Sequence, residues 1–310
     1  RSSAASDVYK RQLYNSLGNA YLFSWQVDEA MEAFERYREH SPEAPDPIHS
    51  IAYALMYCGQ YDYAIRLFEE IIDIDPSFYI VYEDLGSTYL ACGRWREAIT
   101  AFESYLEHAP KTARARGWAK IADIHTIQEN LPLAEEAITK ALELDPYCPE
   151  TLRLQGLIAL KEYKDQKKAL LALEAIGRDE VPTGYTLAAA CYHNLSGWIL
   201  IERGAPEAGL RAMRLAIRSA PNKYICFEKD LVRAYVAIMD AGKAIERGKQ
   251  ILSLNTNDGE LLCLLGEAHE IAGMASIARS YRDQAMNTWK NSDPDFCPVE
   301  QLAYRSSKHI

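Results

Sequence analysis

The pattern in this sequence that comes nearest to catalytic chemistry is the pair His269-Glu270. A zinc-binding helix of the His-Glu-x-x-His type needs a second His one turn later, so that both rings reach one metal ion, and Gly273 stands at that position. The paired carboxylates Glu69 and Glu70 fall on a predicted helix, where two adjacent acids are typical of a solvated face rather than of acid-base catalysis. The sequence contains no phosphate-binding Gly-rich loop and no nucleophile elbow. We therefore expect no catalytic residue, metal site or cofactor, and a protein that is not an enzyme.

The cysteines give no sign of metal or disulfide chemistry. They are scattered singly, without a CxxC pair, and several fall at apolar helix positions, which is typical of reduced core thiols and favours a cytoplasmic location. The chain also has no apolar run of about 18 residues, the length needed to span a membrane. The seven cysteines are Cys58, Cys92, Cys148, Cys191, Cys226, Cys263 and Cys297.

The stretch from Tyr79 to Pro110 shows which elements must position the remaining polar side chains. Its apolar and small residues recur every three or four positions, first over 82–89 and then over 98–105, as on one face of two successive helices. Gly86 and Ala98 carry little side chain, so the two helices can cross closely at these positions. One such hairpin cannot bury its apolar faces alone, and it therefore needs copies of itself on either side.

The chain supplies these copies. From Gly18 to Ala52 and from Ala52 to Gly86 the spacing is 34 residues, and each of the three is followed by Ala twelve residues later and Phe sixteen residues later. Five further copies follow, and they become increasingly degenerate. The eight repeats span residues 13–290 and are centred near Gly18, Ala52, Gly86, Ala122, Gly156, Gly197, Val232 and Gly266.

This pattern resembles the tetratricopeptide repeat. The resemblance implies an all-α fold, a right-handed α-solenoid of about eight helix-turn-helix repeats, with a concave groove lined by the first helix of each repeat. It also implies a noncatalytic scaffold for protein-protein interactions, which binds a peptide or a partner helix in the groove. The chain departs from the family pattern at the start of each first helix, where the usual Trp is replaced, for example by Tyr14, Ile48 and Tyr82.

The groove-facing positions of the family can be carried over repeat by repeat. They fall three residues before and one residue after each crossing residue, or one helical turn further out. Because aromatic and Arg side chains dominate binding hot spots, Tyr53 and Trp198 are the expected anchors, although each residue could equally contact a neighbouring repeat. The expected partner-binding residues are Asp46, His49, Tyr53, Glu83, Asp84, Ser87, Arg116, Lys120, Asp123, Arg153, Trp198 and Arg233, and Asn194, Lys229 and Glu267 occupy equivalent positions.

Charge is distributed unevenly along the repeats. Residues 13–110 hold 17 acidic and 5 basic residues, a net charge of −12, whereas 111–310 hold 26 of each. One interpretation is an acidic outer surface that keeps the repeats soluble; the other is that groove acids attract a basic segment of a protein or peptide partner. No basic stripe for nucleic-acid phosphates is present, so we expect no nucleic-acid partner.

Both ends of the sequence lie outside the repeat pattern. Residues 1–12 carry no repeat signature, and we expect an extraneous or unstructured stretch, with the true N-terminus further upstream. An alternative function follows from this: the repeats are a regulatory arm of a larger enzyme or signalling protein whose catalytic or DNA-binding domain precedes them. Residues 291–310 form a tail in which 298–306 either caps the repeats or begins another one.

Overall fold

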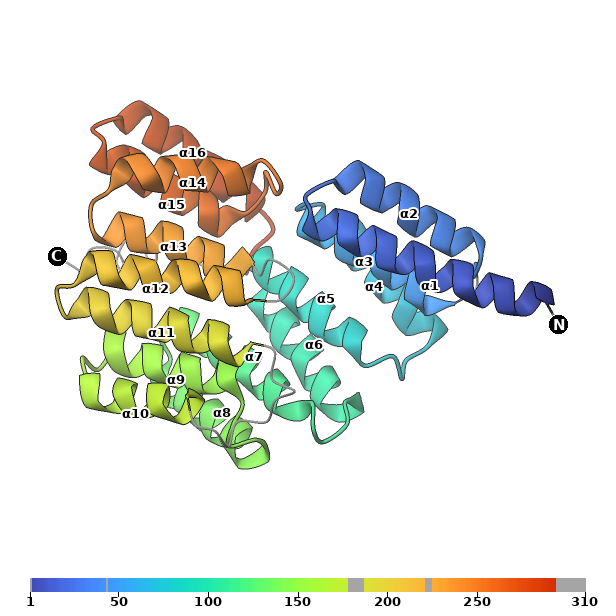
Figure 1. The fold of residues 1–310 in the computed structure, drawn as a ribbon, viewed down its shortest axis with the longest axis horizontal. Helices are drawn as coiled ribbons and strands as arrows, with labels where there is room; N and C mark the ends of the chain where they lie inside the picture. Colours follow the sequence, from blue (N-terminus) through green and yellow to red (C-terminus); the bar gives the residue numbers. More distant parts are fainter. Residues whose placement is uncertain (1, 43, 178–186, 221–224, 294–310) are drawn as a thin grey trace. The chain divides into compact units, whose positions relative to one another are not determined.

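The computed structural model describes residues 2–42, 44–177, 187–220 and 225–293, with the backbone alone for 2–7. Across these ranges the chain forms sixteen α-helices and no strand, arranged as eight successive helical hairpins (Figure 1). This confirms the all-α fold and the number of repeats expected from the sequence. The helices belong to two compact units, which are described separately below.

Unit 1 consists of residues 1–108 together with 252–258 and 288–296. It contains three hairpins, in which each first helix packs against the second helix of its own repeat. Its helices are α1 (Ser2–Phe23), α2 (Val27–Glu39), α3 (Pro45–Tyr57), α4 (Tyr61–Ile74), α5 (Ile80–Ala91) and α6 (Trp95–His108).

Unit 2 holds the other five hairpins and comprises residues 109–251, 259–287 and 297–310. Its first helices are α7 (Arg114–Ile127), α9 (Pro149–Lys161), α11 (Ala188–Glu202), α13 (Ile225–Ala237) and α15 (Gly259–Ile271). Its second helices are α8 (Leu131–Leu144), α10 (Gln166–Ile176), α12 (Pro206–Ser219), α14 (Ala241–Leu252) and α16 (Ala275–Thr288).

The crossing of each hairpin is made by the small residues that set the register. In unit 1 the Ala residues of the second helices, Ala30, Ala64 and Ala98, are 0 % exposed. The Phe residues one turn further along are exposed by at most 1 %, and they fill the space between the two helices of each repeat. Gly197 and Gly209 make the equivalent crossing in unit 2, where a Cβ on Gly209 would stand 2.6 Å from the Gly197 carbonyl oxygen.

Every hairpin turns through one residue in the left-handed backbone region. Four of the eight turns use Gly, which adopts a positive φ without strain because it lacks a Cβ. The other four use a residue with a side chain, and each therefore carries a conformational cost. The turn residues are Trp25, Gly59, Gly93, Glu129, Lys164, Gly204, Met239 and Gly273, with φ between 53° and 76°.

Local sequence signals mark where several helices begin. Pro residues occupy the first turn of α3, α9 and α12, where no intrahelical partner is needed for the missing N–H. The Asp165 side chain caps α10 by accepting a hydrogen bond of 2.9 Å from the Lys168 backbone N–H.

Residues 2–12 are not unstructured, because α1 begins at Ser2 and runs without a break into the first repeat; that residues 1–12 are extraneous stays a prediction. The backbone can continue a helix there without any repeat signature. Val8 and Tyr9 are 43 % and 67 % exposed, so this extension buries little apolar surface, which is why no periodic pattern marked it. Arg11 contributes one contact, a hydrogen bond of 3.2 Å to the Ser41 hydroxyl. The proposed cap at 298–306 lies outside the described residues.

Candidate binding surfaces on the first helices

The first helices of unit 1 bring together acidic and aromatic side chains. His49 on α3 donates a hydrogen bond of 2.7 Å from Nε2 to Oδ2 of Asp84 on α5, the first helix of the next repeat. The His49 ring also lies 5.4 Å from the Phe78 ring and 6.0 Å from the Phe68 ring, measured between centroids. Both side chains of the ion pair are less than one-fifth exposed. His49 and Asp84 therefore join two repeats, which is the structural alternative left open for each of these positions.

A row of side chains next to this pair is more accessible. Asp46, Tyr53 and Tyr57 follow one another along α3; Asp46 is exposed, and both tyrosines are half-buried. The rings of Tyr53 and Tyr57 lie 6.1 Å apart, and both pack against the core cluster around Phe34. Glu83 on α5 is also half-buried. We call Asp46, Tyr53, Tyr57 and Glu83 the acidic aromatic face. Ser87, one turn along α5 from Glu83, is half-buried as well.

Acids on the second helices of unit 1 differ in their surroundings. Glu70 and Asp73 on α4 are exposed. Glu69, by contrast, accepts a hydrogen bond of 3.2 Å from the Tyr89 hydroxyl through Oε1. Glu70 and Asp73 therefore form a matched set of surface acids against which the acidic aromatic face can be compared.

In unit 2 a continuous polar network links four consecutive first helices. Arg153 on α9 donates from Nη1 to Asn194 Oδ1 on α11 at 3.2 Å, and Asn194 Nδ2 donates to Asp230 Oδ2 on α13 at 3.0 Å. Arg233 pairs with both Asp230 and Glu260, the latter on α15. We call Arg153, Asn194, Asp230, Arg233 and Glu260 the polar ladder.

The polar ladder is largely removed from water. Asn194 is 0 % exposed and Asp230 is 7 % exposed. Burial by itself would lower the pKa of Arg153, but Asp230 and other nearby groups outweigh it, so the net pKa is raised. For Arg233, burial is likewise outweighed, first by Glu260 and then by Asp230, and the pKa is again raised. The guanidinium groups are thus held in their charged form by Asp230 on α13 and, for Arg233, by Glu260 on α15.

The other expected binding residues of unit 2 differ in how exposed their side chains are. Arg116, Lys120 and Asp123 are spaced by four and three residues along α7; Arg116 and Asp123 are exposed and Lys120 is half-buried.

The expectation that Trp198 is an accessible anchor is wrong. Trp198 is 1 % exposed, and the Lys161 ammonium lies 3.8 Å from its ring centroid. Its ring fills the interior of unit 2 and cannot serve as an anchor for a partner. Glu267, at the equivalent position of α15, is buried too, with 9 % exposed.

Two members of the polar ladder were not among the expected binding residues, Asp230 and Glu260. Asp230 lies two residues before the crossing residue Val232, as the expected residues Asp84 and Lys120 do in their repeats, but this position was not carried over to the seventh repeat. Glu260 sits in the first turn of α15, ahead of the repeat pattern. A search for opposite charges at similar positions of first helices two repeats apart would have found Arg153 and Asp230.

His269, the residue that comes nearest to a zinc-ligand pattern in the sequence, has a structural role. His269 is 2 % exposed, and its Nδ1 donates a hydrogen bond of 2.7 Å to the Leu265 carbonyl oxygen. Within the part of the chain that the structure describes, no three His, Cys, Asp or Glu residues are grouped so that they could hold a metal ion. Over the same residues, no helix has the length and apolar character required to cross a membrane.

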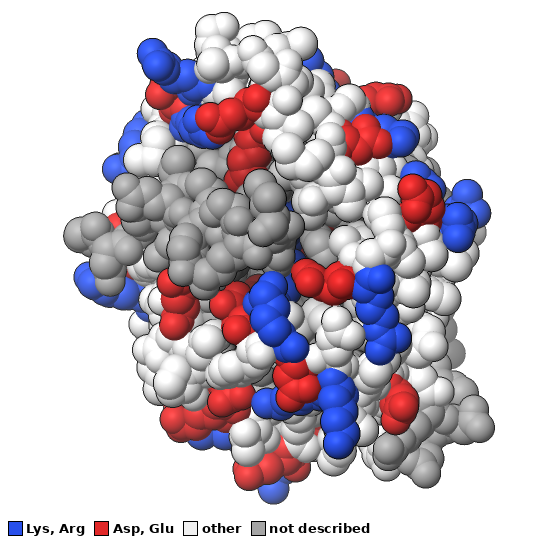
Figure 2. Space-filling model, turned by 90° about the vertical axis from the view of Figure 1, so that its left-hand side faces the viewer, with Lys and Arg blue, Asp and Glu red and all other residues white. Residues whose placement is uncertain are grey.

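Surface charge in unit 2 is mixed rather than segregated. On the face drawn in Figure 2, Lys and Arg side chains lie between Asp and Glu side chains and do not gather into a large patch of one sign. This fits the equal number of acidic and basic residues, 26 of each, over residues 111–310.

Several solved structures are similar to this chain at low sequence identity and with TM-scores below 0.5. MamA residues 41 to the end from Desulfovibrio magneticus RS-1 is 22 % identical, with a TM-score of 0.43 over 54 % of this chain and 94 % of that one. PilF of Pseudomonas aeruginosa is 16 % identical, with a TM-score of 0.49 over 67 % and 92 %. A chain of the APC/C hetero-tetramer Cut9-Hcn1 is also 16 % identical, with a TM-score of 0.49 over 92 % and 54 %. No curated protein matches the sequence.

Family models identify the repeats directly. One model of the tetratricopeptide repeat matches residues 55–124, and a second matches residues 115–148. These segments include the third and fourth hairpins and the second helix of the second hairpin, and the remaining hairpins follow the same order of first helix, turn and second helix. Residues 55–148 of this chain belong to the tetratricopeptide repeat family.

Proposed function

We propose that this chain is a noncatalytic scaffold whose first helices bind a peptide or helical segment of a partner protein, and that the acidic aromatic face of unit 1 is the surface that binds it. Tetratricopeptide repeats support the general role of a protein-interaction scaffold. The particular surface combines two half-buried tyrosines with the exposed carboxylate of Asp46 and the half-buried carboxylate of Glu83.

One observation carries the choice of this surface. Tyr53 and Tyr57 stand one turn apart on α3 with their rings 6.1 Å apart, and Asp46 lies two turns before Tyr53 on the same helix face. Tyrosine supplies a large and rigid contact area, and a nearby carboxylate pairs with Lys or Arg or orients it over the ring. A segment containing basic and apolar residues fits both features.

The polar ladder of unit 2 supports a different role. Its charges are already paired with one another, so a partner would have to displace ion pairs that are shielded from water. We propose that the ladder holds the first helices α9, α11, α13 and α15 in register. In unit 2, only the exposed row of Arg116, Lys120 and Asp123 on α7 remains a proposed partner contact. The free thiols of Cys58, Cys92, Cys148, Cys191 and Cys226 support a reducing, cytoplasmic location as a proposal.

Selection from a random peptide library against the purified chain tests the proposal. Peptides that combine Lys or Arg with an apolar residue should be enriched, and the Tyr53→Ala and Tyr57→Ala variants should reduce their binding at least tenfold. The exposed Tyr63 on α4 offers a matched control, since Tyr63→Ala removes the same side chain from a second helix. Enrichment of acidic peptides, or equal losses from Tyr63→Ala and Tyr53→Ala, would contradict the assignment of this surface.

A further inference from the structure

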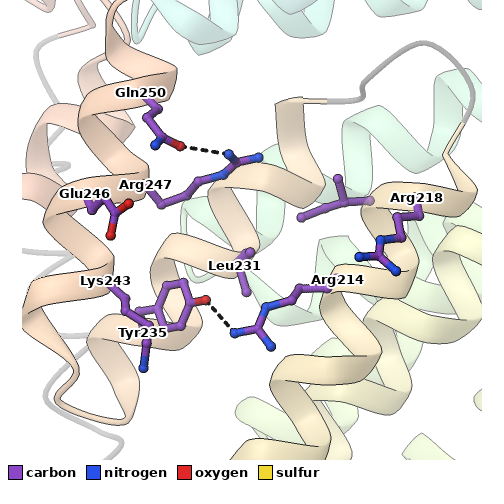
Figure 3. A pocket seen from close by; sticks show the side chains of 9 residues that line it. Arg214, Arg218, Leu231, Tyr235, Lys243, Glu246, Arg247 and Gln250 are labelled. Carbon is purple, nitrogen blue, oxygen red and sulfur yellow. Dashed lines mark hydrogen bonds between the residues drawn. The ribbon is translucent and has the colours of Figure 1, made fainter.

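A pocket of about 360 Å³ opens between helices α12, α13 and α14 of unit 2 (Figure 3). Leu231 and Tyr235 from α13, together with Ile217 from α12, supply its apolar part. Four cationic side chains surround this part: Arg214 and Arg218 on α12, and Lys243 and Arg247 on α14. The pocket shares no residue with the acidic aromatic face or with the polar ladder.

Two of the cations are held in place by neutral or buried partners. Arg214 Nη2 donates a hydrogen bond of 2.9 Å to the Tyr235 hydroxyl oxygen (Figure 3). Arg247 is fixed by Glu228, to which Nε donates at 3.0 Å and Nη2 donates at 2.5 Å, and its Nη1 donates to Gln250 at 2.9 Å. Glu228 is only 3 % exposed, so this pair forms the rigid inner side of the pocket.

The cationic side chains of the pocket outnumber the acidic side chains that lie near them. Glu246 is the one acid that lines the pocket. Behind the lining, Glu228 offsets Arg247, and Asp240 pairs with Lys243 at 2.5 Å. For Arg214 and Arg218, the described part of the chain provides no carboxylate within ion-pair distance, which leaves two guanidinium groups one helical turn apart without a counter-charge.

This combination has a defined chemical preference. Guanidinium groups bind carboxylates and phosphates through parallel hydrogen bonds, and their attraction is strengthened where apolar walls reduce contact with water. The Tyr235 ring and the side chains of Leu231 and Ile217 can contact an apolar body attached to the anion. Pockets of this size accept small organic molecules rather than folded protein segments.

We propose that this pocket binds a small organic anion, with a phosphate or carboxylate group between Arg214 and Arg218 and an apolar body against Tyr235. The anionic group replaces the missing counter-charge of the two arginines, and Lys243 and Arg247 complete a positive rim around it. The site is formed by the second helices α12 and α14 and by Leu231 and Tyr235 of the first helix α13, and it shares no residue with the acidic aromatic face.

Phenyl phosphate is a suitable probe, with benzyl alcohol as a neutral molecule of similar shape and inorganic phosphate as the anion without an apolar body. Calorimetric titration of the full chain at 20 mM NaCl should give saturable binding of phenyl phosphate, with Kd on the order of 1 mM for so small a ligand. Phenylacetate, the anion of phenylacetic acid, tests whether a carboxylate replaces the phosphate. Binding of the aromatic anions should exceed that of benzyl alcohol and of inorganic phosphate at least fivefold.

Variants locate the binding to this pocket. Arg214→Gln combined with Arg218→Gln should weaken phenyl phosphate binding at least tenfold, whereas Arg211→Gln, an exposed arginine on the same helix that does not line the pocket, should leave it unchanged. Lys243→Gln gives an independent loss of binding that keeps the hydrogen bond between Arg214 and Tyr235, and thermal melting verifies that each variant is folded. Equal affinity for benzyl alcohol, equal effects of Arg211→Gln and the double variant, or no binding to the unmodified chain would overturn the proposal.

Discussion

The Phe102 ring lies directly against Gly86, so that a Cβ placed on Gly86 would stand 2.8 Å from Phe102 Cε1. The same kind of contact recurs two repeats earlier, where Gly18 meets the ring of Phe34. These contacts place the first helix of a repeat against its second helix at the closest distance that side chains permit. They also make the packing of a repeat sensitive to a single methyl group.

Adding this methyl group should destabilise the chain. Phe102 is 0 % exposed, so its ring cannot move into solvent, and Gly86→Ala should lower the free energy of unfolding by about 1–3 kcal/mol. Gly242 is the control, because a Cβ there meets only Asp240 Oδ1, at 3.9 Å, and Gly242→Ala should leave stability unchanged or raise it by less than about 1 kcal/mol. Urea denaturation measures both values. A neutral Gly86→Ala variant would mean that this register is wrong.

The turns between helices give a prediction with opposite signs at equivalent positions. Gly204 has a φ of +76° and no atom within 4 Å of an added Cβ, so Gly204→Ala should cost about 1 kcal/mol through backbone strain alone. Met239 has a φ of 63° and is 55 % exposed, so Met239→Gly should remove strain and raise stability by up to about 1 kcal/mol. Chemical denaturation of both variants measures these changes in stability. If Gly204→Ala raised stability, a positive φ at this turn would not strain the backbone.

The polar ladder should be costly to interrupt. Asp230→Asn leaves Arg153 and Arg233 without their shared carboxylate. Breaking a fully buried ion pair typically costs about 3–5 kcal/mol, and the partial exposure of both arginine side chains reduces the expected loss to roughly 2 kcal/mol. Glu39→Gln breaks an ion pair with Arg36 in which both side chains are more than half exposed, and it should have no measurable effect. Similar losses of stability in Asp230→Asn and Glu39→Gln would show that the polar ladder stabilises the chain no more than an exposed ion pair does.

Alkaline pH should destabilise unit 1 through two buried groups. Burial, followed by the charge of Asp62, raises the pKa of Cys92 from 9.0 to about 12. Burial, followed by Glu69, raises the pKa of Tyr89 from 10.0 to about 12. Below pH 9 both groups are protonated in the folded and the unfolded state, so they add no pH dependence there. Above pH 9 only the unfolded state releases these protons, and stability should fall as pH rises toward 12.

Cys92→Ala isolates one of these two groups. The variant should lose less stability than the unmodified chain between pH 8 and pH 10.5, even if its stability at pH 8 is lower. Urea denaturation at the two pH values gives the difference directly. An unchanged pH dependence in the variant would show that the Cys92 thiol does not contribute.

Sequence periodicity was sufficient for the fold but not for every site residue. The spacing of 34 residues from Gly18 to Ala52 and Gly86 fixed the helical crossings, since close packing requires small residues at regular intervals. The same rule failed for Trp198, which occupies the position of the half-buried Tyr53 in another repeat yet is fully buried. How far a first helix exposes that position depends on the side chains of adjacent helices, and one repeat's sequence does not contain that information.

Two further features could not be predicted from each repeat alone: hydrogen bonds between residues far apart in the sequence, and charged side chains that packing between repeats brings together. The bond between His49 and Asp84 joins residues 35 positions apart, and each looked like an independent groove residue. Arg214 and Lys243 lie on second helices, whose charges are usually solvated, and nothing in their spacing indicates that α12 and α14 hold them around Tyr235. Both arrangements follow from packing between repeats, which the sequence of a single repeat does not specify.

Two sets of acids in unit 1 carry the same charge but should differ in their effect on the binding of a partner. Asp46 and Glu83 belong to the acidic aromatic face, and Glu70 and Asp73 lie exposed on α4. If the face binds a basic segment, Asp46→Asn with Glu83→Gln should slow association with a basic library-selected peptide and flatten its salt dependence. Glu70→Gln with Asp73→Asn removes the same charge from a second helix and should do appreciably less, because attraction between exposed charges fades beyond a Debye length of about 8 Å at physiological salt.

Stopped-flow association rates at 50 and 300 mM NaCl give the comparison for both double variants. Asp84 is left unchanged in this design, since its bond to His49 joins two repeats and its loss would confuse binding with stability. A larger effect on the association rate from Asp46 and Glu83 assigns the steering charge to the face itself. Equal effects would reduce the 17 acids of residues 13–110 to a diffuse field, and no effect from either pair would leave them as a solvated surface without a role in binding.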